Sequence, residues 1–178
     1  MRKPFSATPF LRQLFKAFHQ IGNEVILVPY SGEAIQSEWW KCYSNPNLGK
    51  SEFLEKFLKK TKSFESNSSK LIPLLARKFA KPKMEKLLKK ILSNERDISA
   101  IIFIAIPLNQ ITGLSESIKK QYQLPILYYD VDLPTSLPEH GGFTFNYYPG
   151  SNLSEYDSFL VTSEGSVNRL KELGAEHI

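Results

Sequence analysis

Hydrophobic residues near the start of the chain recur with the spacing of an α-helix. Four of them fall at positions i, i+3, i+4 and i+7 and would form one apolar stripe, namely Leu11, Leu14, Phe15 and Phe18. Thr8 suits the N-cap position and Pro9 the first turn, and Gly22 can adopt the positive φ that closes a helix. The pattern therefore predicts a helix from Pro9 to Gly22.

Short apolar runs rich in β-branched and aromatic residues predict buried strands. The four clearest runs are Glu24–Pro29, Ala100–Ile106, Pro125–Tyr129 and Phe159–Thr162. Phe143–Tyr148 alternates between polar and apolar residues, which suits a half-exposed edge strand. Helices are expected over Leu114–Tyr122 and over Ser163–Leu173, the second capped by Ser163 and closed by Gly174. Strands that alternate with helices in this way indicate an α/β fold, a Rossmann-like parallel sheet with helices on both faces.

The segment from about residue 33 to residue 92 is helical in pattern but interrupted, which predicts a helical insertion between two strands of a single domain spanning residues 1–178. Trp39 and Trp40 are expected in a first short helix, and Ser51 caps a second. A third, basic stretch is split by Pro73 and Pro82. Between residues 50 and 90 there are 13 Lys and Arg and 4 Glu, whereas the whole chain has a net charge of +5. The basic character therefore belongs to the insertion.

The composition restricts the class of protein further. A length of 178 residues with 42% hydrophobic and 12% aromatic residues fits one folded domain. The single cysteine, Cys42, excludes an internal disulfide and fits a reducing cytoplasm. There is no apolar run of about 20 residues and no apolar segment after the charged N-terminus, so neither a membrane span nor a secretory signal is expected. A soluble, cytoplasmic protein is predicted.

Three segments resemble the N-terminal domain of GT-B glycosyltransferases, in particular the CgeB-like group and the family 4-like N-domains. These segments are Gly22–Val25, Tyr128–Pro134 and Tyr156–Ala175. The resemblance covers roughly residues 8–30 and 98–178. It implies the acceptor-side domain of a nucleotide-sugar-dependent glycosyltransferase, which transfers a sugar by displacement at the anomeric carbon. The nucleotide-sugar donor would bind mainly through a C-terminal domain beyond Ile178, so this chain by itself is expected to be inactive; the acceptor is unknown.

Candidate site residues follow the predicted strands, because ligands of parallel α/β sheets bind at the carboxyl ends of the strands. We expect Asp130, Asp132 and His140 to be catalytic, since a carboxylate or imidazole can accept a proton or bind a sugar hydroxyl. The alternative is that one Asp caps the turn before Pro134. The expected substrate-binding residues are Lys3, Ser6, Tyr30, Ser31, Pro107, Asn109, Ser163, Glu164 and Gly165. No metal site is expected, and the chain has no nucleotide-binding glycine motif, so no cofactor is predicted.

The basic helices support a second interpretation, a non-enzymatic Rossmann-like module that contacts a partner or an anionic membrane surface. The lysines expected to form this face are Lys83, Lys86, Lys89 and Lys90. A solvated helical face is an equally good explanation. Nucleic acid is an unlikely partner, because no recognised binding module accompanies the charge.

The glycine-bearing first strand of the resembled family is missing before Thr8, although that strand normally lies in the middle of the sheet. Its absence would leave backbone groups of the strands at Glu24–Pro29 and Ala100–Ile106 without partners, at a cost of about 1–3 kcal/mol for each buried group. We therefore expect these two strands to pair directly, or a homodimer to form through a shared strand.

Overall fold

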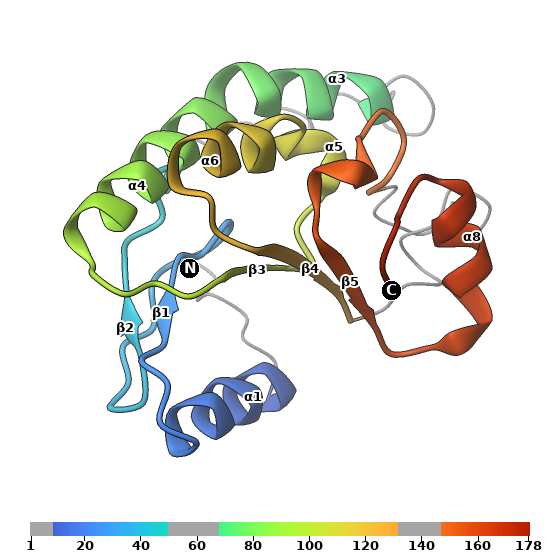
Figure 1. The fold of residues 1–178 in the computed structure, drawn as a ribbon. Coiled ribbons are helices and arrows are strands. Elements are labelled where there is room, and N and C mark those ends of the chain that lie inside the picture. Colours follow the sequence, from blue (N-terminus) through green and yellow to red (C-terminus); the bar gives the residue numbers. More distant parts are fainter. Residues whose placement is uncertain (1–8, 50–67, 132–146) are drawn as a thin grey trace. The chain divides into compact units, whose positions relative to one another are not determined.

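The computed structural model describes residues 9–49, 68–131 and 147–178. The chain divides into two compact units, Met1–Lys62 and Ser63–Ile178, called here the first unit and the second unit. Each unit is described by itself, with the elements labelled as in Figure 1.

The first unit contains one helix and two short strands. Helix α1 (Pro9–Gln20) confirms the predicted helix, with Phe15 as its buried residue. Gly22 adopts a φ of 93° just after the helix, as the sequence indicates. Strand β1 (Ile26–Leu27) follows and pairs in parallel with β2 (Lys41–Cys42). The ring of Phe15 packs edge-on against Trp40 at 5.8 Å, which joins α1 to the segment before β2.

The predicted helix around Trp39 and Trp40 is wrong, and with it the first part of the helical insertion. Ser37 and Trp40 instead form an isolated antiparallel bridge that leads directly into β2. The indole N–H of Trp40 donates to the Ile35 carbonyl at 2.8 Å, which holds the turn closed. Aromatic residues suit extended backbone as well as helices, so the short pattern around Trp39 and Trp40 did not distinguish the two.

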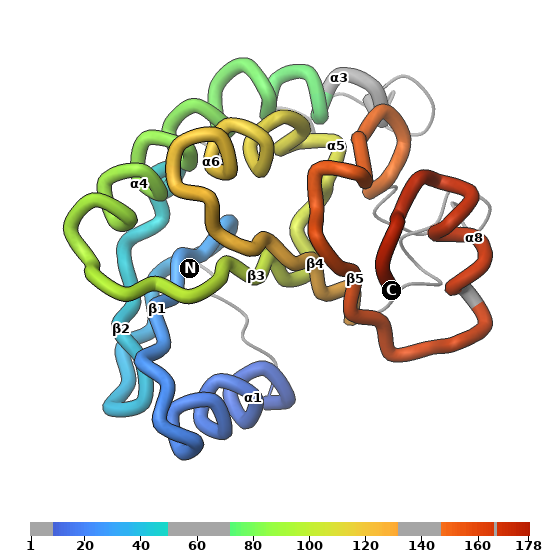
Figure 2. Tube along the Cα trace, viewed as in Figure 1, coloured from blue at the N-terminus to red at the C-terminus, as the bar shows by residue number. Residues whose placement is uncertain are grey.

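The second unit begins with a long helical run, which confirms the predicted basic helix. It consists of α3 (Ser68–Leu75), a π-helical turn (Ala76–Ala80) and α4 (Lys81–Asn94), and Figure 2 shows the three following one another. Pro82 lies in the first turn of α4, where proline is well tolerated, whereas Pro73 lies inside α3. The π-helical turn begins at Ala76, shortly after Pro73, and lies between the two α-helices.

The rest of the second unit is a parallel three-stranded sheet with its connecting helices. The strands β3 (Ile101–Ile104), β4 (Ile126–Asp130) and β5 (Ser158–Val161) lie in that order. The connections contain α5 (Leu108–Ile111) and α6 (Leu114–Tyr122), and the 3-10 turns Leu153–Glu155 and Glu164–Ser166 precede β5 and α8 (Val167–Glu172) respectively. Helices α4 and α6 pack together and lie on the same side of this sheet in Figure 1. The α/β class and the parallel strands are confirmed, in two small sheets.

Aromatic rings fill the core between this sheet and its helices. Tyr128 is fully buried on β4, and its ring contacts those of Tyr148, Tyr156 and Phe159 at centroid distances of 5.6–6.4 Å. Its hydroxyl donates to the Ile106 carbonyl at 2.9 Å, so the polar end of this buried side chain is satisfied. The amphipathic helix predicted at Leu114–Tyr122 buries Leu114 and Ile118 against this core.

The predicted direct pairing of the strands at Glu24–Pro29 and Ala100–Ile106 is wrong for the described residues. β1 pairs with β2, and β3 pairs with β4, in two separate sheets. The reason is that Lys41–Cys42, expected to be helical, supplies the partner of β1. Residues 1–8 and most of Phe143–Tyr148 lie outside the described residues, so strand sharing between two copies of the chain stays a prediction.

Asp157 joins three elements at the amino ends of β4 and β5, which gives the first prediction. Its carboxylate accepts the Ile126 N–H at 2.7 Å and pairs with Lys119 of α6 at 2.8 Å. Burial acts to raise the pKa of Asp157, but these two partners outweigh it and hold the pKa below its ordinary value. The stability that Asp157 contributes is therefore present above the ordinary aspartate pKa of about 3.9 and is lost as the pH falls through the lower folded-state value.

Replacing Asp157 by Asn should lower the free energy of unfolding by about 1 kcal/mol at neutral pH, because the ion pair is lost and the hydrogen bond to Ile126 becomes weaker. Urea unfolding at a series of pH values measures this difference, which should shrink below about pH 4. Glu172→Gln is the control, since the Arg169–Glu172 pair lies at the surface within one helix. An equal effect of both variants at every pH would contradict the role assigned to Asp157.

Candidate functional site

The carboxyl ends of β3, β4 and β5 meet at one edge of the sheet, because the three strands are parallel. This carboxyl edge carries six of the residues expected from the sequence. Pro107 and Asn109 follow β3, Asp130 ends β4, and Ser163, Glu164 and Gly165 follow β5. All six residues therefore follow or end strands at one edge of the sheet, and their roles in binding or catalysis stay predictions.

Asp130 is buried at this edge and hydrogen-bonded. Asp130 is only 1% exposed, and its Oδ2 accepts a hydrogen bond from the hydroxyl of Tyr148 at 2.6 Å. Burial, together with the carboxylate of Asp130, raises the pKa of Tyr148 far above its ordinary value, so the phenol keeps its proton and remains a donor. In this geometry Asp130 holds the residues around Tyr148 in place at the strand end. Its catalytic role stays a prediction.

The segment after β3 is tied to the π-helical turn by Arg77. The guanidinium donates through Nε to the Asn109 carbonyl at 2.6 Å and through Nη2 to the Gly150 carbonyl at 3.2 Å. The Asn109 N–H in turn donates to the Tyr147 carbonyl at 2.9 Å. The sequence analysis missed Arg77 and Tyr148, although the Tyr148-Pro149-Gly150 triplet is a turn signal that could have drawn attention to this corner.

Ala105, the first residue after β3, has a φ of 48°, a left-handed conformation that costs a residue with a Cβ about 1–2 kcal/mol. Its N–H still donates to the Tyr129 carbonyl at 2.9 Å, so the ladder to β4 continues to this point. The strained residue redirects the chain at the carboxyl edge, and strain of this kind is concentrated at functional sites.

At the end of β5 the expected cap of the last helix is wrong in detail. Ser163 occupies the N-cap position but makes no side-chain capping hydrogen bond, and a 3-10 turn precedes α8. The helix start is therefore held by its backbone and not by the Ser163 hydroxyl. Glu164 and Gly165 are exposed beside it.

The remaining site predictions lie elsewhere. Tyr30 and Ser31 belong to the first unit, where the side chain of Asn45 donates to the Tyr30 and Gly32 carbonyls at 3.3 and 3.2 Å. Burial raises the pKa of the Tyr30 phenol far above its ordinary value. The other four predicted residues, Lys3, Ser6, Asp132 and His140, lie outside the described residues.

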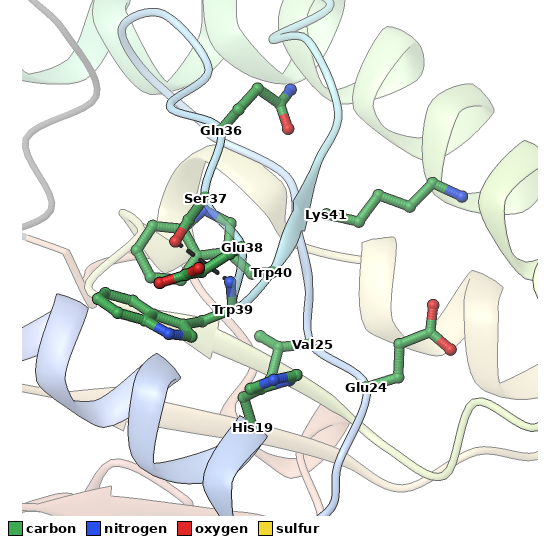
Figure 3. Close-up of a pocket in the computed structure, with 9 residues that line it drawn as sticks. All are labelled: His19, Glu24, Val25, Gln36, Ser37, Glu38, Trp39, Trp40 and Lys41. Carbon is green, nitrogen blue, oxygen red and sulfur yellow. Dashed lines mark hydrogen bonds between the residues drawn. The ribbon is translucent and has the colours of Figure 1, made fainter.

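The first unit also contains an open pocket of about 350 Å³, which we call the Trp39 pocket. It is formed where β1 and β2 begin, by residues at the end of α1, just before β1 and in the turn before β2 (Figure 3). In this view the indole of Trp39 and the carboxylate of Glu38 lie on one side, and the side chains of Glu24 and Lys41 extend to the other. No functional role is predicted for these residues from the sequence.

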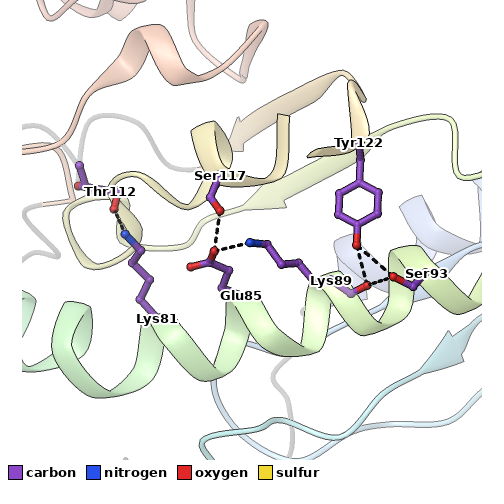
Figure 4. A network of polar contacts seen from close by, with 7 residues as sticks. All are labelled: Lys81, Glu85, Lys89, Ser93, Thr112, Ser117 and Tyr122. Atoms are coloured by element: carbon purple, nitrogen blue, oxygen red, sulfur yellow. Dashed lines mark hydrogen bonds and ion pairs between the residues drawn. The ribbon is translucent and has the colours of Figure 1, made fainter. Parts of the chain in front are cut away.

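The predicted lysine face divides into two parts. Lys89 is turned toward α6, where it pairs with Glu85 at 2.8 Å, and Glu85 also accepts the Ser117 hydroxyl at 2.5 Å (Figure 4). These two hydrogen bonds lower the pKa of Glu85 below its ordinary value. This ion pair occupies the ammonium group of Lys89, whose side chain is still 34% exposed, so its place on the predicted face stays a prediction. Lys86 and Lys90 are exposed, and Lys83 is half-buried.

Two large apolar side chains are exposed near these lysines. Leu74 of α3 and Phe79 of the π-helical turn are each 57% exposed. The ammonium group of Lys78, also exposed, lies 5.6 Å from the Phe79 ring centroid. We call Leu74, Lys78, Phe79, Lys86 and Lys90 the basic–apolar face.

The chain matches no protein-family model, no curated protein and no solved structure. Within residues 9–49, 68–131 and 147–178, no helix is both long and apolar enough to cross a membrane. In the same ranges, no group of three or more His, Cys, Asp or Glu side chains could hold a metal ion.

The buried Asp130–Tyr148 hydrogen bond gives the second prediction. Tyr148→Phe removes a donor from a carboxylate that is almost fully buried, so the free energy of unfolding should fall by about 1–3 kcal/mol. Tyr122→Phe is the matched control, because the Tyr122 hydroxyl bonds the Lys89 carbonyl at a half-buried position where water can replace it. Thermal or urea unfolding measures both variants. A loss no larger for Tyr148→Phe than for Tyr122→Phe would show that the buried bond contributes little.

Proposed function

We propose that the second unit is the acceptor-side half of a nucleotide-sugar-dependent glycosyltransferase, with its ligand at the carboxyl edge of β3, β4 and β5. In the proposed reaction a hydroxyl oxygen of the acceptor attacks the anomeric carbon, the bond to the nucleoside diphosphate breaks, and a base takes the hydroxyl proton. Asp132 and His140 are the proposed bases. Asp130, which Tyr148 holds in a buried position, acts as a positioning residue.

The observation that carries this proposal is the convergence of Asn109, Asp130 and Glu164 at one edge of three consecutive parallel strands. That is the edge at which open α/β sheets bind ligands. The strained Ala105 lies at the same edge. The segments Tyr128–Pro134 and Tyr156–Ala175, which resemble the glycosyltransferase N-domain, include the carboxyl end of β4 and the whole of β5 and α8.

The proposal predicts that the reading frame continues past Ile178 into a second α/β domain. The product of the complete frame should release nucleoside diphosphate from a nucleotide sugar in the presence of an acceptor, whereas residues 1–178 alone should not. Asp130→Asn in the complete protein should lower kcat/KM about tenfold or more, which is 1.4 kcal/mol of transition-state stabilisation.

Asp157→Asn is the matched control for this measurement, because Asp157 lies at the opposite, amino-terminal edge of the same sheet. Its kcat/KM should stay close to that of the unchanged protein at neutral pH. A stop codon directly after Ile178 would count against the enzyme, and equal losses of kcat/KM in both variants would show that the carboxyl edge has no special role.

We also propose a second candidate function, docking to an anionic membrane surface through the basic–apolar face. The specific observation is that Leu74 and Phe79 are exposed on the same helical run as Lys78, Lys86 and Lys90. Apolar side chains that enter the interface and lysines that attract anionic headgroups bind lipid together. Lys89 is not counted in this face because its ammonium group pairs with Glu85.

Vesicle sedimentation tests the docking proposal. The chain should bind vesicles containing about 30% phosphatidylserine, and binding should weaken as salt is raised toward roughly 0.5 M. Reversing Lys86 and Lys90 to Glu should weaken binding about tenfold or more, since each lysine contributes about 1 kcal/mol near such a surface. Lys171→Glu on α8 is the control, because it changes an exposed charge of the same unit elsewhere. Unchanged binding by the double variant would exclude docking through this face.

A further inference from the structure

We propose that the Trp39 pocket of the first unit is a binding site for a neutral sugar ring, separate from the carboxyl edge of the second unit. The pocket lies at the amino-terminal ends of β1 and β2, where Glu24 and Val25 precede one strand and Trp39 and Trp40 precede the other. The proposal does not depend on glycosyltransferase activity.

The turn that presents Trp39 is fixed by several interactions. Ser37 and Trp40 close it as a bridge, and the Ser37 hydroxyl oxygen accepts the Trp39 N–H at 3.3 Å. Trp40 is buried against Phe15 and bonded to the Ile35 carbonyl, which anchors the far side of the turn. A binding group held in this way loses little conformational freedom when a ligand arrives.

Trp39 supplies the apolar surface of the pocket. Its indole is half-buried, so part of the ring remains open where it lines the pocket. The ammonium group of Lys16 covers part of the ring, 4.3 Å from its centroid, so a ligand would meet the remaining exposed part. The C–H groups on one face of a sugar ring are weakly electropositive and apolar, and they suit the same kind of surface.

The polar residues that line the pocket suit a ligand with many hydroxyls. Exposed Glu38, on the Trp39 side, and exposed Glu24, on the opposite side, provide acceptors, and exposed His19 provides a ring nitrogen that can donate or accept. Two lysines accompany these two carboxylates: Lys41 lines the pocket with its ammonium group near the Tyr43 ring, and Lys16 lies beside Trp39. A balanced set of donors and acceptors favours a neutral polyol over a strongly charged ligand.

The size of the pocket agrees with this ligand. Its volume of about 350 Å³ lies at the lower end of the range for small-molecule sites, about 300–1,000 Å³. The pocket is open to solvent, so a sugar ring can enter as one residue of a longer oligosaccharide.

The test uses the two tryptophans of the chain, whose indole N–H groups give two signals in a ¹H–¹⁵N NMR spectrum. Trp39→Phe assigns them. Titration of the full chain with maltotriose, cellotriose and chitotriose should move the Trp39 signal saturably with at least one sugar, with a Kd on the order of 10 mM or lower. The Trp40 signal should move less, because its N–H is bonded to Ile35. Glycerol, which has hydroxyls but no ring face, should move neither.

Two variants make the result specific. Trp39→Ala should abolish binding, and Glu38→Gln, a change at an exposed side chain that leaves the fold intact, should weaken it several-fold. Asp130→Asn should leave the sugar-induced shift unchanged, so failure of the glycosyltransferase proposal would not be confused with failure of this one. The proposal would be overturned if none of the three sugars moved the Trp39 signal. It would also be overturned if, in a parallel titration, only the cation tetramethylammonium moved it.

Discussion

Short parallel strands leave many backbone groups at their ends, and satisfying those groups is the constraint on which the second unit depends. Each strand has only four or five residues, so backbone groups just beyond the paired residues need other partners. Side chains from neighbouring elements supply the missing partners: Asp157 binds the Ile126 N–H, and Tyr128 binds the Ile106 carbonyl. The polar residues of this core therefore connect elements as well as satisfy individual groups.

The same constraint explains the connection between α5 and α6. Gly113 turns the chain there with a φ of 79°, and the two carboxylate oxygens of Glu155 both accept its N–H at 2.9 Å. Burial outweighs this hydrogen bond and raises the pKa of Glu155. On the other side of the connection, Lys81 donates a hydrogen bond to the Thr112 carbonyl at 2.6 Å, and Arg77 donates one to the Asn109 carbonyl. The basic helix is therefore partly a structural support of the carboxyl edge, and its lysines cannot all be treated as one surface.

The helices and strands that depend on local residue patterns could be predicted from the sequence. Helix Leu114–Tyr122 was located with both ends correct, and the strands of the second unit to within a few residues, because apolar periodicity and glycine signals agree there. The convergence of Asp130 and Asn109 followed from strand order alone. Trp39 and Trp40 were misassigned because their extended backbone depends on Phe15 and β1, which are distant in sequence. The burial of Asp130 beside Tyr148 and the hydrogen bond from Ser117 to Glu85 also depend on tertiary partners that no short window contains.

The two units present different chemistry at opposite strand ends. In the second unit, the carboxyl edge combines a buried carboxylate, a strained Ala105 and the anchored Asn109, which suits a site that must hold its groups rigidly. In the first unit, the Trp39 pocket lies at the amino ends of its strands and is open, aromatic and balanced in charge, which suits weak recognition of a neutral ligand.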